Sequence, residues 1–147
     1  QFDMPDDADE NLLLPLGKAK VVREGTDLTI VATSTMVGKS LTVAEHMAKD
    51  GVNIEVIDPR TIKPFDYETV ARSVKKTGKL LVVDEGNTSF GISGEIGFGI
   101  MKDVFYDLEA PMMRVCAPDV PLPFSPVLEK LVVPNENMIL EAVKKLV

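Results

Sequence analysis

Three short apolar runs constrain the fold more than any other feature of this sequence. They read TIVA at residues 29–32, IEVI at 54–57 and LLVV at 80–83, and longer segments with helical periodicity separate them. A continuous apolar run is typical of a strand that is covered on both faces of its sheet. Strands that alternate with helices favour right-handed crossovers and a mostly parallel sheet. We therefore predict a three-layer α/β/α domain.

Local signals place the other elements of this domain. A helix is expected over Ser34 to Lys49, and Asp66 is expected to cap a second helix that ends at Gly78. A further strand is predicted at Met112 to Cys116, and Asn135 is expected to cap the last helix. Near the start, Glu24-Gly25 joins two β-rich runs, a hairpin signal that predicts one antiparallel strand at an edge.

The composition excludes several classes of function. The net charge of −7 argues against a surface for nucleic acid or an anionic membrane, and no apolar run approaches the roughly 20 residues of a membrane span. The single cysteine, Cys116, cannot form an internal disulfide and is expected to be a buried strand residue. These features favour a reducing compartment, either the bacterial cytoplasm or an organelle matrix.

A glycine-rich stretch after the third apolar run, DEGNTSFGISGEIGFG, has the order of a nucleotide-binding loop. Its glycines do not have the G-x-G-x-x-G spacing of a dinucleotide site, and Asp84 and Glu85 stand where a phosphate would approach. Gly91, Gly94 and Gly97 recur every three residues, which favours close packing of a helix against a neighbouring element or subunit. A free-standing nucleotide- or flavin-binding module remains the alternative.

The other reactive side chains form no recognisable catalytic or metal site. His46, the only histidine, is expected to be a solvated helix residue. Asp84 and Glu85 are adjacent in a strand and should point to opposite faces, which leaves one carboxylate exposed. The scattered Met and Phe residues are expected in the core. We therefore assign no catalytic, cofactor-binding or metal-binding residue to this chain.

Four segments together resemble a known family. They are LPLGKAKVVREGTDLTIVATSTMV, VIDPRTIKPFD, GKLLVVDEG and PDVPLPFSPVLEKLVVP, in this order. They resemble the C-terminal domain of the beta subunit of thiamine-diphosphate-dependent 2-oxo acid dehydrogenases, which include the decarboxylating components of pyruvate, branched-chain and acetoin dehydrogenases. The resemblance implies a transketolase-type C-terminal domain at residues 15–147, with a five-stranded mixed sheet. Residues 1–14 resemble a linker from an upstream pyrimidine-binding domain.

The resemblance also implies what such a domain does. The parent enzyme decarboxylates a 2-oxo acid and transfers the acyl group to a lipoyl group, with thiamine diphosphate and Mg²⁺ bound mainly by other domains and the alpha subunit. This domain would serve assembly, with an alpha subunit, a second beta subunit and the subunit-binding domain of the acyltransferase as partners. Such binding domains are commonly basic, which the net charge of −7 would suit.

Three segments are the expected subunit contacts. They are residues 90–97, residues 121–129 and the final helix with Val147, whose carboxylate is expected near the acyltransferase site. The individual candidates are Phe90, Gly91, Gly94, Gly97, Pro123, Phe124 and Val147. PFSPVLE is shared by pyruvate-type and acetoin-type members, so the substrate stays open. The same segment disfavours a third possibility, a transketolase or deoxyxylulose phosphate synthase.

Overall fold

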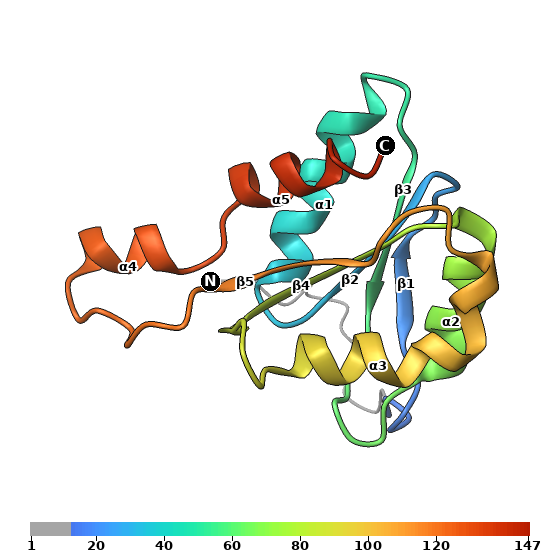
Figure 1. The fold of residues 1–147 in the computed structure, drawn as a ribbon, viewed down its shortest axis with the longest axis horizontal. Coiled ribbons are helices and arrows are strands. Elements are labelled where there is room, and N and C mark those ends of the chain that lie inside the picture. The colour runs from blue at the N-terminus through green and yellow to red at the C-terminus, as the bar shows by residue number, and fades with distance from the viewer. Residues whose placement is uncertain (1–12) are drawn as a thin grey trace.

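Helices cover both faces of a five-stranded sheet in the computed structural model, which describes residues 13–147 (Figure 1). Most of the predicted linker, residues 1–14, therefore lies outside the described residues. In chain order the elements are β1 Lys20–Arg23, β2 Leu28–Ala32, α1 Met36–Ala48, β3 Ile54–Asp58, α2 Tyr67–Thr77, β4 Leu80–Asn87, α3 Ile92–Val104, the 3₁₀ turn η1 Phe105–Asp107, β5 Met113–Ala117, α4 Pro126–Val132 and α5 Glu136–Val143.

The sheet has the order β1-β3-β2-β4-β5. Strand β1 runs antiparallel to β3, with Val21 opposite Ile57, and the other neighbouring pairs are parallel. The predicted α/β class and the antiparallel edge strand are therefore confirmed. The predicted hairpin is wrong, because β3 inserts between β1 and β2. Residues Ile54 to Ile57 of β3 are all buried, whereas β1 is only partly buried, so β3 occupies the inner position and β1 the edge.

The segment read as a hairpin turn instead crosses over the end of β3. The amides of Thr26 and Asp27 both donate to the carbonyl of Asn53 at 2.9 Å. A side chain at Gly25 would overlap the backbone of Ile54 and Glu55, so only glycine fits this crossing. Glu24-Gly25 has the composition of a turn. The backbone that requires glycine at position 25 belongs to Ile54 and Glu55, about thirty residues later in the sequence.

Two apolar cores lie on opposite faces of the sheet because successive strand side chains alternate. Leu28 and Ile30 of β2 point toward α1 and α5, whereas Val31 points toward α2 and α3. The predicted caps are confirmed: Asp66 accepts a hydrogen bond from the Thr69 amide, and Asn135 accepts one from the Met138 amide. Gly78 ends α2 in a left-handed conformation with φ of 69°.

A buried ionised side chain joins β3 to α2. Glu55 is 2% exposed, pairs with Lys76 and accepts a hydrogen bond from the Gly25 amide at 3.2 Å. Burial opposes ionisation of Glu55, but its hydrogen bonds, chiefly from Lys76, outweigh burial and lower the pKa of the carboxyl. Glu55 therefore links the segment at Gly25 and strand β3 to helix α2.

Candidate interaction surface

The described residues carry many large apolar side chains that are exposed to solvent, and none of their helices is long and apolar enough to cross a membrane. Exposed apolar groups that gather in one region of a soluble domain mark interaction sites. Most of them lie in three places, namely the segment that contains α4, the loop before α3, and α3 with the η1 turn after it. The residues are Phe90, Phe98, Phe105, Tyr106, Val120, Leu122, Phe124, Val127, Leu128 and Leu131.

Helix α4 has no buried side chain. It lies on a segment, residues 118–134, that leaves the body of the domain after β5 and returns at α5 (Figure 1). We call this segment the arm. A cavity of about 470 Å³ lies beside α4 and is bordered by Lys39 of α1, whose ammonium donates to the Pro134 carbonyl at 2.7 Å. A helix with exposed apolar side chains and no fully buried one is typical of an interaction surface.

The loop before α3 presents Phe90 to solvent in a strained conformation. Its φ is 56°, a left-handed value that is costly for an aromatic residue, and its side chain is fully exposed. The preceding Ser89 donates from its amide and its hydroxyl to Asp119 at 2.9 and 2.6 Å, and these hydrogen bonds lower the pKa of the Asp119 carboxyl. The loop is thereby fastened to the start of the arm.

The same loop is poorly suited to a phosphate group. The Gly86 amide donates to the carboxylate of Asp84 at 3.2 Å, and the Ser89 amide donates to Asp119. A side chain at Gly91 would overlap the Asn87 carbonyl, so this glycine serves the turn itself. Amides that already donate to carboxylates are not free for a phosphate, and the carboxylates would repel one. This arrangement argues against the nucleotide- or flavin-binding alternative.

The residues at this end of the sheet also do not fit thiamine diphosphate with Mg²⁺. Within residues 13–147 no group of three His, Cys, Asp or Glu side chains could hold a metal ion. Asp84, the one buried carboxylate here, accepts hydrogen bonds from the Thr33 hydroxyl at 2.6 Å and from Gly86. Glu85 is exposed, in agreement with the predicted split of the two carboxylates. We therefore derive no step of catalysis through the cofactor on this chain.

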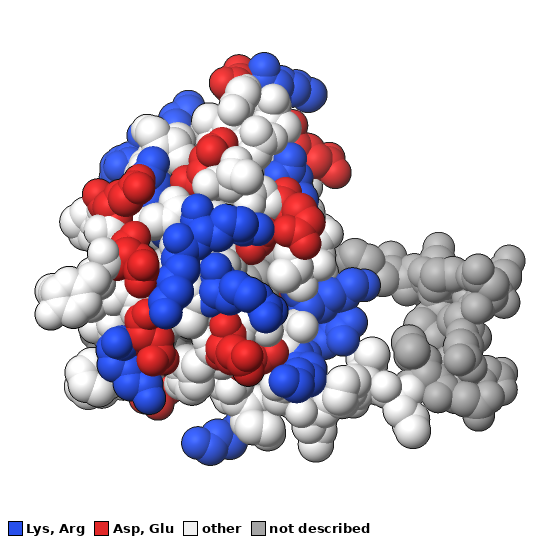
Figure 2. Space-filling model, turned by 90° about the vertical axis from the view of Figure 1, so that its right-hand side faces the viewer, with Lys and Arg blue, Asp and Glu red and all other residues white. Residues whose placement is uncertain are grey.

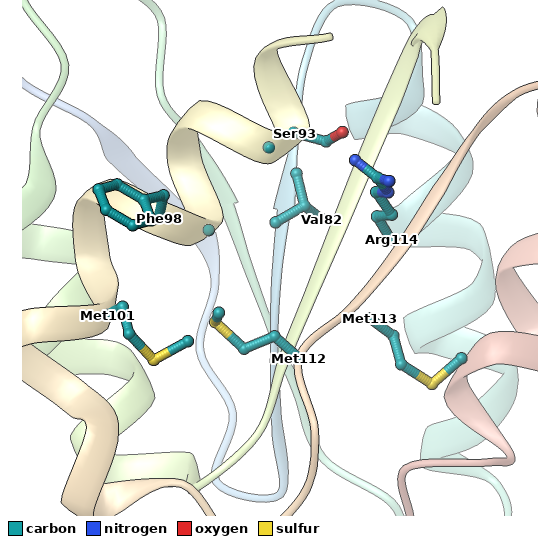
Figure 3. Close-up of a pocket in the computed structure, with 9 residues that line it drawn as sticks. Val82, Ser93, Phe98, Met101, Met112, Met113 and Arg114 are labelled. Carbon is teal, nitrogen blue, oxygen red and sulfur yellow. The ribbon is translucent and has the colours of Figure 1, made fainter. Parts of the chain in front are cut away.

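A cavity of about 290 Å³ lies between α3 and β5, lined by Gly94, Gly97, Phe98 and three methionines (Figure 3). A Cβ at Gly94 would lie 3.7 Å from the Arg114 guanidinium, and one at Gly97 would lie 3.7 Å from the Met112 methyl group. These are ordinary contacts, so close packing inside this chain does not explain the predicted glycine stripe. The tightly packed glycine of α3 is Gly99, where a Cβ would overlap the Tyr67 ring.

The seven candidate contact residues do not form one surface. Phe90 and Gly91 lie in the loop fastened to the arm, which contains Pro123 and Phe124, and both aromatic rings are fully exposed. Gly94 and Gly97 line the cavity beside β5. Val147 follows α5 at the end of the domain away from α4 (Figure 1) and is 43% exposed.

The expectation that the scattered Phe residues belong to the core is wrong for Phe98 and Phe105, which are 85% and 59% exposed. Sequence reasoning also missed Tyr106, which is 96% exposed and packs edge-on against Phe105 with ring centroids 5.1 Å apart. A usable signal was present for Phe98. It lies off the stripe of Ile96 and Ile100, the residues that face the sheet, and glycine stands on each side of it.

The remaining reactive side chains lie as expected. Cys116 is buried, and its thiol donates to the Ser93 hydroxyl at 3.3 Å. Burial raises the pKa of this thiol, and the nearby Asp84 carboxylate adds to the effect, so it is a poor nucleophile. His46 is exposed on α1.

The charge of the chain is distributed differently from the expectation. Residues 1–12 contain five acidic and no basic residues, whereas residues 13–147 contain eighteen acidic and sixteen basic ones. On the face shown in Figure 2, Lys and Arg side chains gather at the centre, with Asp and Glu around them. The described domain therefore has a mixed surface and not a strongly acidic one.

Comparison with known proteins places the chain in a family. The model of the transketolase C-terminal domain matches residues 17–139. The chain belongs to this family. The chain is 44% identical over 146 residues to the mitochondrial pyruvate dehydrogenase E1 component subunit beta of Dictyostelium discoideum, and this match covers 99% of the chain. It is also 44% identical to the corresponding subunit of Rickettsia felis over 98% of the chain.

These relatives are longer than the chain, which spans 41% and 43% of their lengths. Among solved structures, a split-gene transketolase described as an inactive β4 tetramer superposes with a TM-score of 0.76 and 25% identity. That match covers 97% of this chain and 45% of the other. The resemblance stated from the sequence motifs and the expected fold family are both confirmed.

Proposed function

We propose that this chain is the C-terminal domain of the beta subunit of a pyruvate-dehydrogenase-type decarboxylating component, and that it contributes assembly and not chemistry. The observation that carries this proposal is α4, an apolar helix with no buried side chain on an arm that leaves the domain. The similarity to pyruvate dehydrogenase beta subunits over nearly the whole chain supports the choice of parent enzyme. The parent reaction is decarboxylation of a 2-oxo acid with transfer of the acyl group to a lipoyl group.

Three partners follow from this role. The arm and the loop of Phe90 contact the alpha subunit or a second beta subunit, and the end of α5 at Val147 contacts the subunit-binding domain of the acyltransferase. Thiamine diphosphate and Mg²⁺ are held by other parts of the enzyme, since Asp84 and the loop amides here are already engaged within the chain. The described β4 tetramer of a related transketolase supports contacts between beta-type chains.

The test is a calorimetric titration of the 147-residue chain with the alpha subunit and, separately, with the subunit-binding domain of the acyltransferase. Repeating each titration at higher salt separates electrostatic from apolar contacts. We expect binding to at least one partner, and we expect the double variant Leu128→Ser, Leu131→Ser to weaken binding of the alpha subunit by roughly tenfold or more, because apolar anchors dominate such interfaces. A folded wild-type chain that binds neither partner would overturn the proposal.

The matched control is Ile62→Ser. Ile62 is 54% exposed, like Leu128 at 51%, but it lies in the connection between β3 and α2 and not on the arm. Its replacement should leave binding unchanged. If this control weakened binding as much as the α4 variant, the loss would not depend on where the serine is introduced, and the arm would not be the contact.

A further inference from the structure

A surface away from the arm and the loop of Phe90 also exposes apolar side chains. It lies where the described part of the chain begins, beside the connection between β3 and α2 (Figure 1). Leu14 and Leu16 at this start are more than half exposed, and so is Ile62 in the connection. Exposed apolar groups that gather in this way indicate an interaction site.

Hydrogen bonds join the start of the described chain to this connection. The Gly17 amide donates to the Thr61 hydroxyl at 2.9 Å, and the Thr61 hydroxyl donates to the Pro64 carbonyl at 2.7 Å. Two residues later, the Ala19 amide donates to the buried Asp66 carboxylate at 3.0 Å. A Cβ at Gly17 would lie only 2.9 Å from Cγ of Pro64, so the two segments pack closely. They therefore form one continuous surface.

Arg60 has a strained backbone conformation at this surface. Its φ is 59°, a left-handed value that is costly for a residue with a long side chain, and the side chain is exposed. The Arg60 amide donates to the Asp58 carboxylate at 2.8 Å, which holds the backbone in place. Strain that the surrounding structure maintains is typical of a residue that contacts a ligand or a partner.

The surface is positively charged, although the described domain as a whole is not. Residues 13–20 and 58–66 contain four basic and two acidic residues, whereas residues 13–147 contain sixteen basic and eighteen acidic ones. Both acidic side chains, Asp58 and Asp66, already accept hydrogen bonds from backbone amides. Within the described part of the chain, none of the four basic residues forms an ion pair. The surface therefore suits a segment that carries both carboxylates and apolar side chains.

We name this surface the entry patch, and it consists of Leu14, Leu16, Lys18, Arg60, Ile62 and Lys63. We propose that the entry patch binds residues 1–12 of the same chain. These residues lie outside the described ones, and the proposal uses only their sequence, QFDMPDDADENL. This sequence contains five carboxylates, no basic residue, and the apolar side chains of Phe2 and Met4. Opposite charges select the partner, and apolar contact adds to the binding.

Covalent attachment favours this segment over a separate molecule of the same chemistry. Residues 1–12 directly precede Leu13, so they are attached at the entry patch itself. Twelve residues span at most about 40 Å, roughly the diameter of a domain of this size. A short covalent connection gives an effective concentration in the millimolar range, so a contact of modest intrinsic affinity is occupied. The inference goes beyond the proposed function, because it does not depend on the parent enzyme.

The rate at which the Lys63 amine is acetylated in the 147-residue chain, measured by mass spectrometry, tests this contact. A bound segment covers the amine, and its carboxylates favour the protonated form, so both effects slow the reaction. The comparison is a variant that carries Asp3→Asn, Asp6→Asn, Asp7→Asn, Asp9→Asn and Glu10→Gln. We expect Lys63 to react several-fold faster in this variant than in the wild type. Equal rates in the two proteins would overturn the proposal.

Lys102 of α3 is the matched internal control. It is exposed like Lys63 but lies outside the entry patch. Its rate should be the same in both proteins, and added salt should remove most of the difference at Lys63, since exposed charges are screened. An equal acceleration at Lys63 and Lys102 would mean that the carboxylates act through the general field of the chain, and the proposed contact would be refuted.

Two further variants separate a specific contact from charge alone. Phe2→Ser with Met4→Ser keeps all five carboxylates and should still speed the acetylation of Lys63, because it removes the apolar side chains of the segment. On the patch, Arg60→Asn should have the same effect, and asparagine tolerates the left-handed backbone, so the fold is kept. Lys49→Asn, which replaces an exposed basic residue outside the patch, is its control. Protection of Lys63 that survives both of the first two changes would contradict the proposal.

Discussion

Asp119 accepts two hydrogen bonds from Ser89, one from the amide at 2.9 Å and one from the hydroxyl at 2.6 Å. The two residues lie thirty positions apart in the sequence, Ser89 beside the strained and exposed Phe90 and Asp119 at the start of the arm. The contact makes the loop and the arm one unit. Because the loop and the arm are already held together, a partner that binds both has fewer conformations to restrict. This reduces the conformational entropy lost on binding.

The first prediction concerns this contact. Asp119→Ala removes both acceptors, so the Ser89 amide should exchange with solvent faster than in the wild type, whereas the global stability should change little at this exposed site. Hydrogen exchange followed by NMR measures both quantities. Asp119→Asn keeps one acceptor and should give intermediate protection. Equal protection of Ser89 in all three proteins would show that the loop is held by other contacts.

The second prediction concerns the buried pair Glu55–Lys76. Lys76→Met leaves a buried carboxylate without its ammonium and should lower the free energy of unfolding at pH 7 by roughly 2 kcal/mol, an amount discounted for the 42% exposure of the lysine. Glu24→Gln removes only the exposed partner of Lys76, at 3.2 Å, and should cost less than about 1 kcal/mol. Urea unfolding measures these differences.

The pH dependence of this penalty has a definite sign. In the wild type the pKa of Glu55 is lowered, so its contribution to stability is present above the pKa of the unfolded chain and is lost as the pH falls through the folded value. In Lys76→Met, burial acts without the ammonium and raises that pKa. The penalty should therefore shrink as the pH is lowered from 7 toward the unfolded value of about 4.3. A penalty independent of pH would mean that Lys76 stabilises the domain by packing.

Local signals in the sequence were enough to predict most elements. Asp66 and Asn135 cap helices because a carboxylate or amide oxygen reaches the amide three residues ahead, and Gly78 ends α2 because only glycine adopts its conformation without cost. The apolar runs predicted which strands are buried on both faces. These features depend on neighbours within a few positions, which the sequence displays directly.

Contacts between segments that are distant in the sequence were harder to predict. The turn signal at Gly25 is real, but the strand that pairs with β1 is β3, which follows about thirty residues later. The glycine stripe of α3 was predicted, but its neighbours come from a distant segment: Arg114 lies in β5 and Met112 directly before it. Phe98 and α4 are exposed because no other part of the described domain packs over them. The hydrophobic periodicity of the sequence does not show whether such a packing element exists.

The third prediction compares glycines that differ in their surroundings. Gly94→Ala should stabilise the isolated domain by about 0.5–1 kcal/mol, because alanine has a higher helix propensity and its methyl group would meet only the flexible end of Arg114 at 3.7 Å. Gly25→Ala should destabilise it by about 3 kcal/mol, since its methyl group would overlap the backbone of β3. Thermal unfolding of the two variants measures both effects, and destabilisation by Gly94→Ala would reveal tighter packing around α3.

The last prediction compares two adjacent helices, α4 and α5. Leu131 of α4 is 73% exposed and Ile139 of α5 is fully buried. Leu131→Ala should change the free energy of unfolding by no more than about 0.5 kcal/mol, whereas Ile139→Ala should lower it by about 3 kcal/mol, because it leaves a cavity between α5 and the sheet. Denaturant unfolding of the isolated chain measures both. In the assembled enzyme the order should change, with Leu131→Ala weakening subunit association and Ile139→Ala affecting it only through folding. A large loss of stability from Leu131→Ala in the isolated chain would mean that α4 packs on its own domain, and the arm would then no longer support an assembly role.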